Sequence, residues 1–189
     1  ISSNPDLKIP PRLFVDCDKL TTISIPSSMT TIREESFENC KSLRQVTIPS
    51  SVKYIGKRAF KGCISLMKIS ILSSNITIKE EAFCDCNQVI ISKEMLKVPS
   101  NCFYNSCSLK QVLFENPSLI TYIGNYAFYN CLSLTQIILP SSLTSIGDYA
   151  FYKCSLLTNI DIPSSLTSIG ENAFKECSAL IQITIHSSV

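Results

Sequence analysis

Charged residues are scarce in this sequence. They make up 17% of its 189 positions, and 17 basic residues nearly balance 15 acidic ones. No block of lysine or arginine occurs, so the electrostatic footprint of a nucleic-acid-binding or anionic-membrane-binding protein is missing. Long hydrophobic runs are missing as well, because stretches such as Ile137-Ile138-Leu139 are far shorter than the roughly 20 residues that span a bilayer. The sequence therefore predicts no nucleic-acid partner and no transmembrane segment.

The residue types that catalysis uses are equally sparse. The only histidine, His186, stands at the end of an expected strand, remote in sequence from the cysteines that could act with it. The glycines are isolated, so no phosphate-binding loop is present, and Glu34-Glu35 and Glu80-Glu81 are expected to be solvated charges on outer turns. We therefore expect a non-enzymatic protein with no catalytic residue, no cofactor and no metal site.

The sequence does contain a long internal repeat. Its spacing is mostly 23 residues, and its unit reads L-x-x-I-x-I-P-S-S-L-x-x-I-G-x-x-A-F-x-x-C. Such periodicity is the signature of a solenoid, in which each unit is too small to bury its own core and stacked units bury a common one. The repeated phenylalanines are Phe14, Phe37, Phe60, Phe83, Phe103, Phe128, Phe151 and Phe174.

Each part of the unit has a physical interpretation. The alternating apolar pair in L-x-x-I-x-I predicts a strand with one buried face, and the following Pro-Ser-Ser ends that strand in a turn. In the segment after glycine, the apolar residues Ala150, Phe151, Cys154 and Leu157 have helical spacing. This spacing predicts a short helical turn with one inward face.

One column of the repeat holds glycine at positions 56, 124, 147 and 170. The same column holds Arg33, Lys79, Pro10 and Pro99, and proline fixes φ near −65°. We therefore predict negative φ throughout this column, with glycine selected because neighbouring backbones approach closely.

The unit resembles the BspA-like leucine-rich repeat, most clearly in I-P-S-S-L-T-S-I-G-x-x-A-F-x-x-C-S-x-L at 162–180. The resemblance implies an α/β repeat fold: a right-handed solenoid with a parallel concave sheet and short helical turns on the convex side. It also implies a role in adhesion or protein binding at cell surfaces. We expect one domain over 1–189, with about eight coils, as a fragment of a longer chain that is open at both ends. An open strand near Val189 could support end-to-end self-association.

The stretch 84–123 departs from the pattern. One unit loses three residues and the Pro-Ser-Ser turn, and the next gains two residues around Glu115-Asn116-Pro117-Ser118. Two interpretations remain open: an insertion and deletion tolerated on an outer loop, or a functional irregularity that changes the curvature.

Seven of the ten cysteines occupy one column of the repeat, where we expect a buried ladder of reduced thiols. The three others, Cys84, Cys102 and Cys107, lie in the irregular stretch. A disulfide among them, or a zinc site with Cys86, is a weaker alternative.

Two columns of strand residues are expected to face solvent on the concave side. They suggest partner-binding residues, although stacked amides could equally be structural. Leu113 and Ile138 are apolar where neighbouring repeats are polar, which marks a hydrophobic contact spot. The candidates on this face are Lys68, Gln111, Leu113, Gln136, Ile138, Asn159 and Asp161.

Tyrosines are concentrated in the second half, where six of seven lie between 104 and 152. Exposed tyrosines are enriched at interfaces, so Tyr126, Tyr129, Tyr149 and Tyr152 are candidates for partner binding, unless they merely cover the flank of the irregular coils. The leading hypothesis is a secreted or cell-surface recognition module that binds a protein or glycoprotein. The alternative is a cytoplasmic scaffold that uses the same surfaces.

Overall fold

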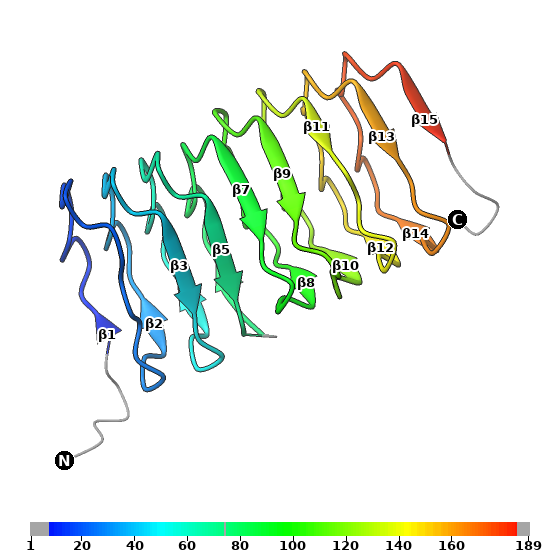
Figure 1. The fold of residues 1–189 in the computed structure, drawn as a ribbon. Coiled ribbons are helices and arrows are strands. Elements are labelled where there is room, and N and C mark those ends of the chain that lie inside the picture. The colour runs from blue at the N-terminus through cyan, green and yellow to red at the C-terminus, as the bar shows by residue number, and fades with distance from the viewer. Residues whose placement is uncertain (1–7, 74, 185–189) are drawn as a thin grey trace.

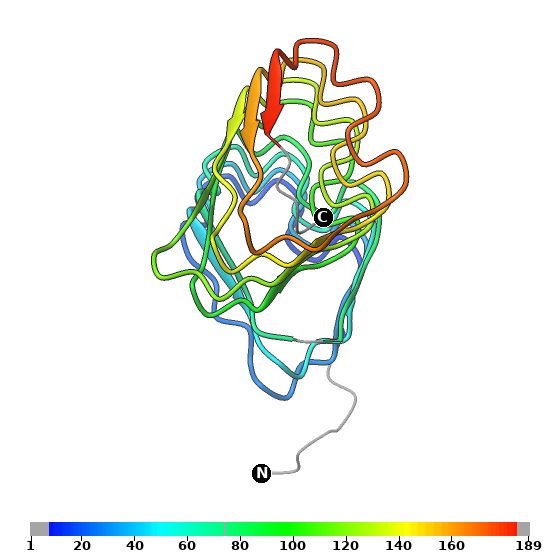
Figure 2. The ribbon, with the colours of Figure 1, turned by 90° about the vertical axis from the view of Figure 1, so that its right-hand side faces the viewer.

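The computed structural model describes residues 8–73 and 75–184. Over these residues the chain winds into a solenoid of about seven turns, built from parallel strands and tight turns (Figure 1). Viewed along its length, successive turns lie nearly on top of one another (Figure 2). The predicted repeat architecture with a parallel sheet is confirmed.

The longer strand of each repeat joins one continuous sheet, hereafter the long sheet. Its strands follow one another along the solenoid, and their register pairs equivalent residues, such as Asn159 with Gln182 and Gln111 with Gln136. Alternate residues such as Val46 and Ile48 are buried, as the sequence pattern predicts. The strands are β3 (Gln45–Ile48), β5 (Lys68–Ile71), β7 (Gln88–Ile91), β9 (Gln111–Phe114), β11 (Gln136–Ile137), β13 (Asn159–Asp161) and β15 (Gln182–Thr184).

A second set of strands, each two residues long, was not anticipated from the sequence. These strands carry the isoleucine that precedes the glycine column, and they form two separate four-stranded sheets. The first sheet contains β1 (Lys8–Ile9), β2 (Thr31–Ile32), β4 (Tyr54–Ile55) and β6 (Thr77–Ile78). The second contains β8 (Lys97–Val98), β10 (Tyr122–Ile123), β12 (Ser145–Ile146) and β14 (Ser168–Ile169).

The predicted helical turns are wrong: the described residues contain no helix. Each of the eight repeated phenylalanines is flanked at two residues on either side by a left-handed residue, for example Glu35 (φ 54°) and Asn39 (φ 59°) around Phe37. An α-helix needs uninterrupted negative φ, so these residues prevent it. Instead, the Phe37 N–H donates to the Ala59 carbonyl of the next repeat at 2.8 Å. The turns thus form a hydrogen-bonded ladder between repeats.

The residues predicted to point inward from these turns do so, although the backbone is not helical. Ala150, Phe151, Cys154 and Leu157 are all fully buried. The phenylalanine rings stack along the solenoid, as with Phe37 and Phe60 at 5.0 Å between ring centroids. Stacked rings and aliphatic side chains therefore form one continuous core.

The glycine column behaves as predicted. Only Gly62, outside the column, has positive φ among the five glycines. A Cβ added at Gly56 would lie 2.5 Å from the backbone nitrogen of Glu34 in the preceding repeat. Glycine is present here because the backbones of adjacent repeats are in close contact.

The irregular stretch forms a seam between two regular halves. Between β5 and β7 the register shifts by two residues, since Lys68 pairs with Ile90 rather than with Gln88, its equivalent in the next repeat. A two-residue shift preserves the side-chain alternation, so Val89 and Ile91 remain buried.

The phenylalanine stack breaks at the same place. Phe83 and Phe103 are tilted by 46° at 6.1 Å, whereas the other consecutive rings are stacked. The two short-strand sheets also end here, at β6 and β8. The irregularity is therefore more than a surface insertion, because it changes the register, the core and the sheet together.

Candidate binding surfaces

Five tyrosines form a continuous aromatic surface, hereafter the tyrosine face. It lies on the turns of repeats 5 to 7, which carry Phe103, Phe128 and Phe151. Ring-centroid distances within its two ladders are 4.8 to 5.1 Å, and tilted contacts of 5.7 Å join the ladders. One ladder contains Tyr104, Tyr129 and Tyr152, and the other contains Tyr126 and Tyr149. All five side chains are partly exposed. The sequence grouped these residues, but Tyr122 lies apart, on β10, and its hydroxyl hydrogen-bonds Asn125.

Two members of the tyrosine face stand in a strained backbone position. Tyr126 and Tyr149 have φ of 57° and 54°, in the left-handed region that bulky side chains rarely occupy. The equivalent position is left-handed in other repeats too, where it is filled by asparagines such as Asn101, which tolerate this region, and by charged residues such as Glu35 and Arg58. The left-handed backbone is therefore a property of the repeat, and it costs a bulky side chain on the order of 1–3 kcal/mol.

The far edge of the tyrosine face meets a negative charge. The Tyr152 hydroxyl donates to the Glu176 carboxylate, and this hydrogen bond raises the Tyr152 pKa to about 12. Lys153 lies 3.7 Å from the other carboxylate oxygen of Glu176. Tyr152 therefore stays neutral and oriented at any physiological pH.

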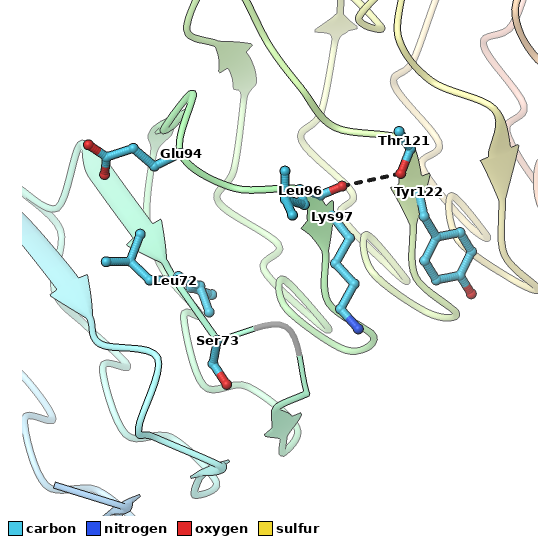
Figure 3. Close-up of a pocket in the computed structure, with 8 residues that line it drawn as sticks. Leu72, Ser73, Glu94, Leu96, Lys97, Thr121 and Tyr122 are labelled. Atoms are coloured by element: carbon cyan, nitrogen blue, oxygen red, sulfur yellow. Dashed lines mark hydrogen bonds between the residues drawn. The ribbon is translucent and has the colours of Figure 1, made fainter. Parts of the chain in front are cut away.

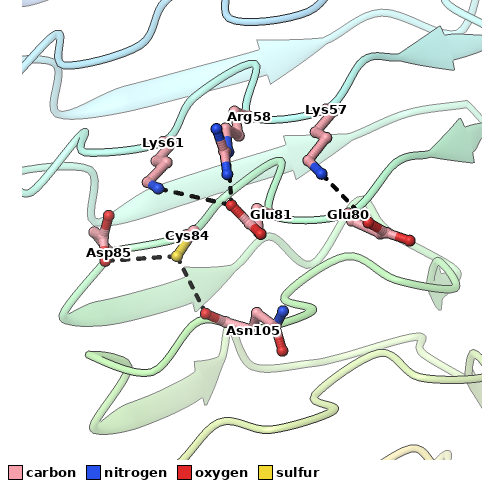
Figure 4. Close-up of polar contacts among 8 residues, drawn as sticks. All are labelled: Lys57, Arg58, Lys61, Glu80, Glu81, Cys84, Asp85 and Asn105. Atoms are coloured by element: carbon pink, nitrogen blue, oxygen red, sulfur yellow. Dashed lines mark hydrogen bonds and ion pairs between the residues drawn. The ribbon is translucent and has the colours of Figure 1, made fainter.

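The first half of the turn surface is charged instead of aromatic (Figure 4). Arg58 Nε lies 2.8 Å from the Glu81 carboxylate, with Lys61 Nζ 3.6 Å from the same oxygen. Partial burial raises the Glu81 pKa, but the Arg58 hydrogen bond and the nearby cations outweigh it, so the pKa lies below its usual value. Glu81 is therefore an ion-paired residue, whereas the sequence suggested a freely solvated one.

The long sheet presents an apolar spot to solvent, as the sequence predicted. Ile138 is 65% exposed, and two hollows of about 270 and 300 Å³ open on either side of it. Leu113 is half-buried and lines the larger hollow with Ile138. Gln136, Asn159 and Asp161 line the smaller one.

Other residues predicted for this face have partners within the chain. Lys68 Nζ lies 2.6 Å from the Glu115 carboxylate, and the Gln88 amide donates to Gln111 at 2.9 Å. Gln88 was not among the residues predicted for this face, because the deletion before β7 conceals its place in the column of strand residues that contains Gln111. Ser70 alternates with the inward-facing Ile69 and Ile71 on β5, but it is buried beside the displaced β7. These contacts favour a structural role for Lys68 and Gln111.

The cysteine column is buried, as predicted from the repeat, except for Cys17, which is partly exposed. Five of its thiols donate to the phenylalanine carbonyl of the preceding repeat, for example Cys63 to Phe37 at 3.2 Å, whereas Cys86 lies 3.9 Å from the Cys63 carbonyl. In the one repeat without this cysteine, the Ser106 hydroxyl makes the equivalent bond to Phe83 at 3.1 Å. The column therefore selects a small hydrogen-bond donor, a requirement the sequence pattern did not reveal.

All ten cysteines are free thiols in the structure, including the three outside the column. Burial raises the pKa of Cys102 and of Cys86 well above the usual range. Burial also raises the pKa of Cys84, to about 12, with the neighbouring Asp85 charge adding to the shift (Figure 4). Thiols with raised pKa values are poor nucleophiles and poor metal ligands at neutral pH.

The described residues contain no group of three or more histidine, cysteine, aspartate or glutamate side chains arranged to hold a metal ion. They also contain no helix long and apolar enough to cross a membrane. His186 and Val189 lie outside the described residues.

The family profile described as BspA type leucine rich repeat region matches residues 7–118 and 96–189, in six copies. The chain belongs to this family. Among solved structures, it is similar to a leucine-rich repeat protein from Bacteroides ovatus ATCC 8483, with 28% identity and a TM-score of 0.61 over 95% of this BspA-type chain. It is also similar to a leucine rich cell surface protein from Faecalibacterium prausnitzii A2-165, with 28% identity and a TM-score of 0.53 over 93% of the chain.

The BspA-type chain spans 60% and 56% of the lengths of these two proteins, respectively. No curated protein sequence matches it significantly. Leucine-rich repeats of this family are typically protein-interaction modules.

Proposed function

We propose that this chain is a recognition module that binds a protein at a cell surface, with the tyrosine face as its principal contact. The observation that carries the proposal is the five-ring aromatic surface on these turns. Tyrosine supplies a large, stiff contact area at low entropic cost and dominates many protein interfaces. The tyrosine face replaces the ion-paired turns of the first half, so the turn surface is specialised in repeats 5 to 7.

The cell-surface assignment is supported by the similarity to the Faecalibacterium prausnitzii cell surface protein. A cytoplasmic scaffold is the second candidate, favoured by the free thiols of all ten cysteines. Antibody labelling of intact and permeabilised source cells separates the two. Labelling of intact cells supports the surface module, whereas labelling that appears only after permeabilisation supports the scaffold.

Replacing Tyr126 and Tyr149 together by asparagine tests the tyrosine face directly. Asparagine fits the left-handed backbone, as Asn101 and Asn172 do, so the fold should be retained or slightly stabilised. Binding of the fluorescent chain to intact cells should weaken by roughly 30-fold or more, since two central tyrosines each contribute on the order of 1–2 kcal/mol to such interfaces.

The matched control places asparagine at the same two backbone positions in the charged half, by Glu35→Asn with Arg58→Asn. Both residues have left-handed φ, of 54° and 57°, so the backbone change is equivalent. The control should bind as the wild type does. Equal binding by the tyrosine double variant and the wild type would rule the tyrosine face out as the principal contact.

A further inference from the structure

Hydrogen bonds join the short strands in a strictly repeated way, and the seam interrupts them. In a regular repeat the glycine-column N–H donates to the isoleucine carbonyl of the preceding repeat, as Gly56 does to Ile32 at 2.8 Å. The corresponding donor opposite Ile78 would be Pro99, which has no N–H. Across the described residues, no backbone bond connects β6 to β8, and each of these strands pairs on one side only.

The interruption leaves acceptors open on the β6 edge. Elsewhere two carbonyls per repeat accept bonds from the next repeat, for example Lys53 from Thr77 and Ile55 from Lys79. Within the described ranges, the equivalent carbonyls of Ile76 and Ile78 accept no such bond. An unpaired strand edge is a template for another strand.

A hollow of about 270 Å³ lies at this interruption (Figure 3). Each side contributes an exposed leucine: Leu72, 39% exposed, follows β5, and Leu96, 59% exposed, precedes β8. Glu94 lines the hollow as well. Ser73 and Lys97 also line it, from opposite sides of the seam (Figure 3). Its volume is at the small end of the roughly 300–1,000 Å³ typical of ligand pockets, which suits one or two side chains better than a whole cofactor.

The hollow also contains a polar group without a partner. The Ser73 side chain is 4% exposed, and its hydroxyl makes no hydrogen bond. Buried hydroxyls are normally hydrogen-bonded, so one without a partner needs an explanation. The other such hydroxyl among the described residues, that of Ser51, does not line this hollow.

We propose that the seam between β6 and β8 is a docking site for an extended peptide segment of a protein partner. The backbone of the peptide donates to the open carbonyls of Ile76 and Ile78, adding a strand at the β6 edge. An apolar side chain of the peptide sits between Leu72 and Leu96. The Ser73 hydroxyl, which is closed to solvent in the free chain, accepts a polar partner from the peptide when its side chain rotates toward the hollow.

An extended peptide matches the site better than other occupants, because the open carbonyls need the regularly spaced N–H donors of a peptide backbone. Two open carbonyls spaced along one strand need two donors at the same spacing, which successive alternate amides of an extended peptide supply. A simple amphiphile fills the hollow but offers no such pair. This site involves none of the tyrosines of the tyrosine face, so its test is independent of the test of the proposed function.

The test is a selection of random nine-residue peptides on the whole chain, followed by anisotropy measurements with each synthetic peptide. Leu96→Asp should weaken binding by roughly tenfold or more, because it places a carboxylate where the apolar side chain of the peptide would sit. Leu156→Asp is the matched control: Leu156 is 51% exposed and lies outside the seam, so affinity should be unchanged. Methylating alternate backbone nitrogens of the peptide should also abolish binding.

Circular dichroism of both leucine variants verifies that the solenoid is intact. A selection without binders, or binders that keep their affinity for Leu96→Asp or after N-methylation, would overturn the proposal. Binders that are lost with Tyr126→Asn instead would also overturn it, since they would belong to the tyrosine face. If the chain dimerises without binding any peptide, and Leu96→Asp abolishes the dimer, the occupant of the seam is a second copy of the chain and the peptide proposal is wrong.

Discussion

Replacing Phe60 by alanine should lower the free energy of unfolding by about 3–5 kcal/mol, the cost of a large aromatic truncation in a packed core. Phe60 is fully buried and stacks on Phe37 at 5.0 Å and on Phe83 at 5.1 Å. The substitution leaves a cavity that the neighbouring repeats cannot close, because their spacing is fixed by the hydrogen-bonded ladder. Urea unfolding followed by circular dichroism measures the change.

Ile64→Ala is the comparison for this variant. Ile64 lies four residues further along the same repeat and is 50% exposed, so its truncation should change stability by at most about 0.5 kcal/mol. Equal effects of the two substitutions would mean that the phenylalanine column is not the centre of the core.

The second large effect is expected from Gly56→Ala, which should destabilise the chain by about 1–3 kcal/mol through overpacking. The added Cβ would lie 2.5 Å from the Glu34 nitrogen and 2.7 Å from the Arg33 carbonyl carbon. Both contacts are to backbone, so no side-chain movement relieves them, and adjacent repeats must separate. Thermal unfolding with matched urea titrations measures the loss.

Lys79→Ala is the control for this prediction, because Lys79 occupies the same column and already carries a Cβ. Its exposed side chain should be replaceable at a cost within about 0.5 kcal/mol. If Gly56→Ala proves as mild as Lys79→Ala, close backbone approach is not the reason for glycine at this position.

The buried face of the strands in the long sheet could be predicted because a strand with one buried face leaves a period-two pattern in the sequence. Val46 and Ile48 alternate with Gln45 and Thr47, and the structure buries the first pair and exposes the second. The negative φ of the glycine column was also predictable, because proline in the same column excludes positive φ.

The prediction of helical turns was wrong for an identifiable reason. Helical spacing of inward residues is also produced by a tight turn that returns to the core every three or four residues. The left-handed positions that distinguish the two are occupied by Glu35, Arg58 and Tyr126, which do not favour positive φ as glycine does. The residue types that favour positive φ at these positions are Gly62, asparagines such as Asn39, and aspartates such as Asp85.

The two candidate surfaces differed in how far the sequence revealed them. The clustering of tyrosines is visible in the sequence, but their stacking into two joined ladders is not, because Tyr104 and Tyr129 are 25 residues apart and align only in the structure. The seam depends on Pro99, whose missing N–H is evident from the sequence. It also depends on a two-residue register shift at β7, which arises from pairing between distant segments. No local pattern encodes such pairing.

Hydroxyl-radical footprinting of the chain bound to intact cells tests the central claim most directly. Tyr54 serves as an internal reference, because it is partly exposed on β4, outside the tyrosine face. The account predicts that Tyr126, Tyr129 and Tyr149 are protected from oxidation in the bound chain, while Tyr54 is oxidised at the same rate as in the free chain. Unchanged oxidation of the three tyrosines in a saturably bound chain would contradict recognition through the tyrosine face.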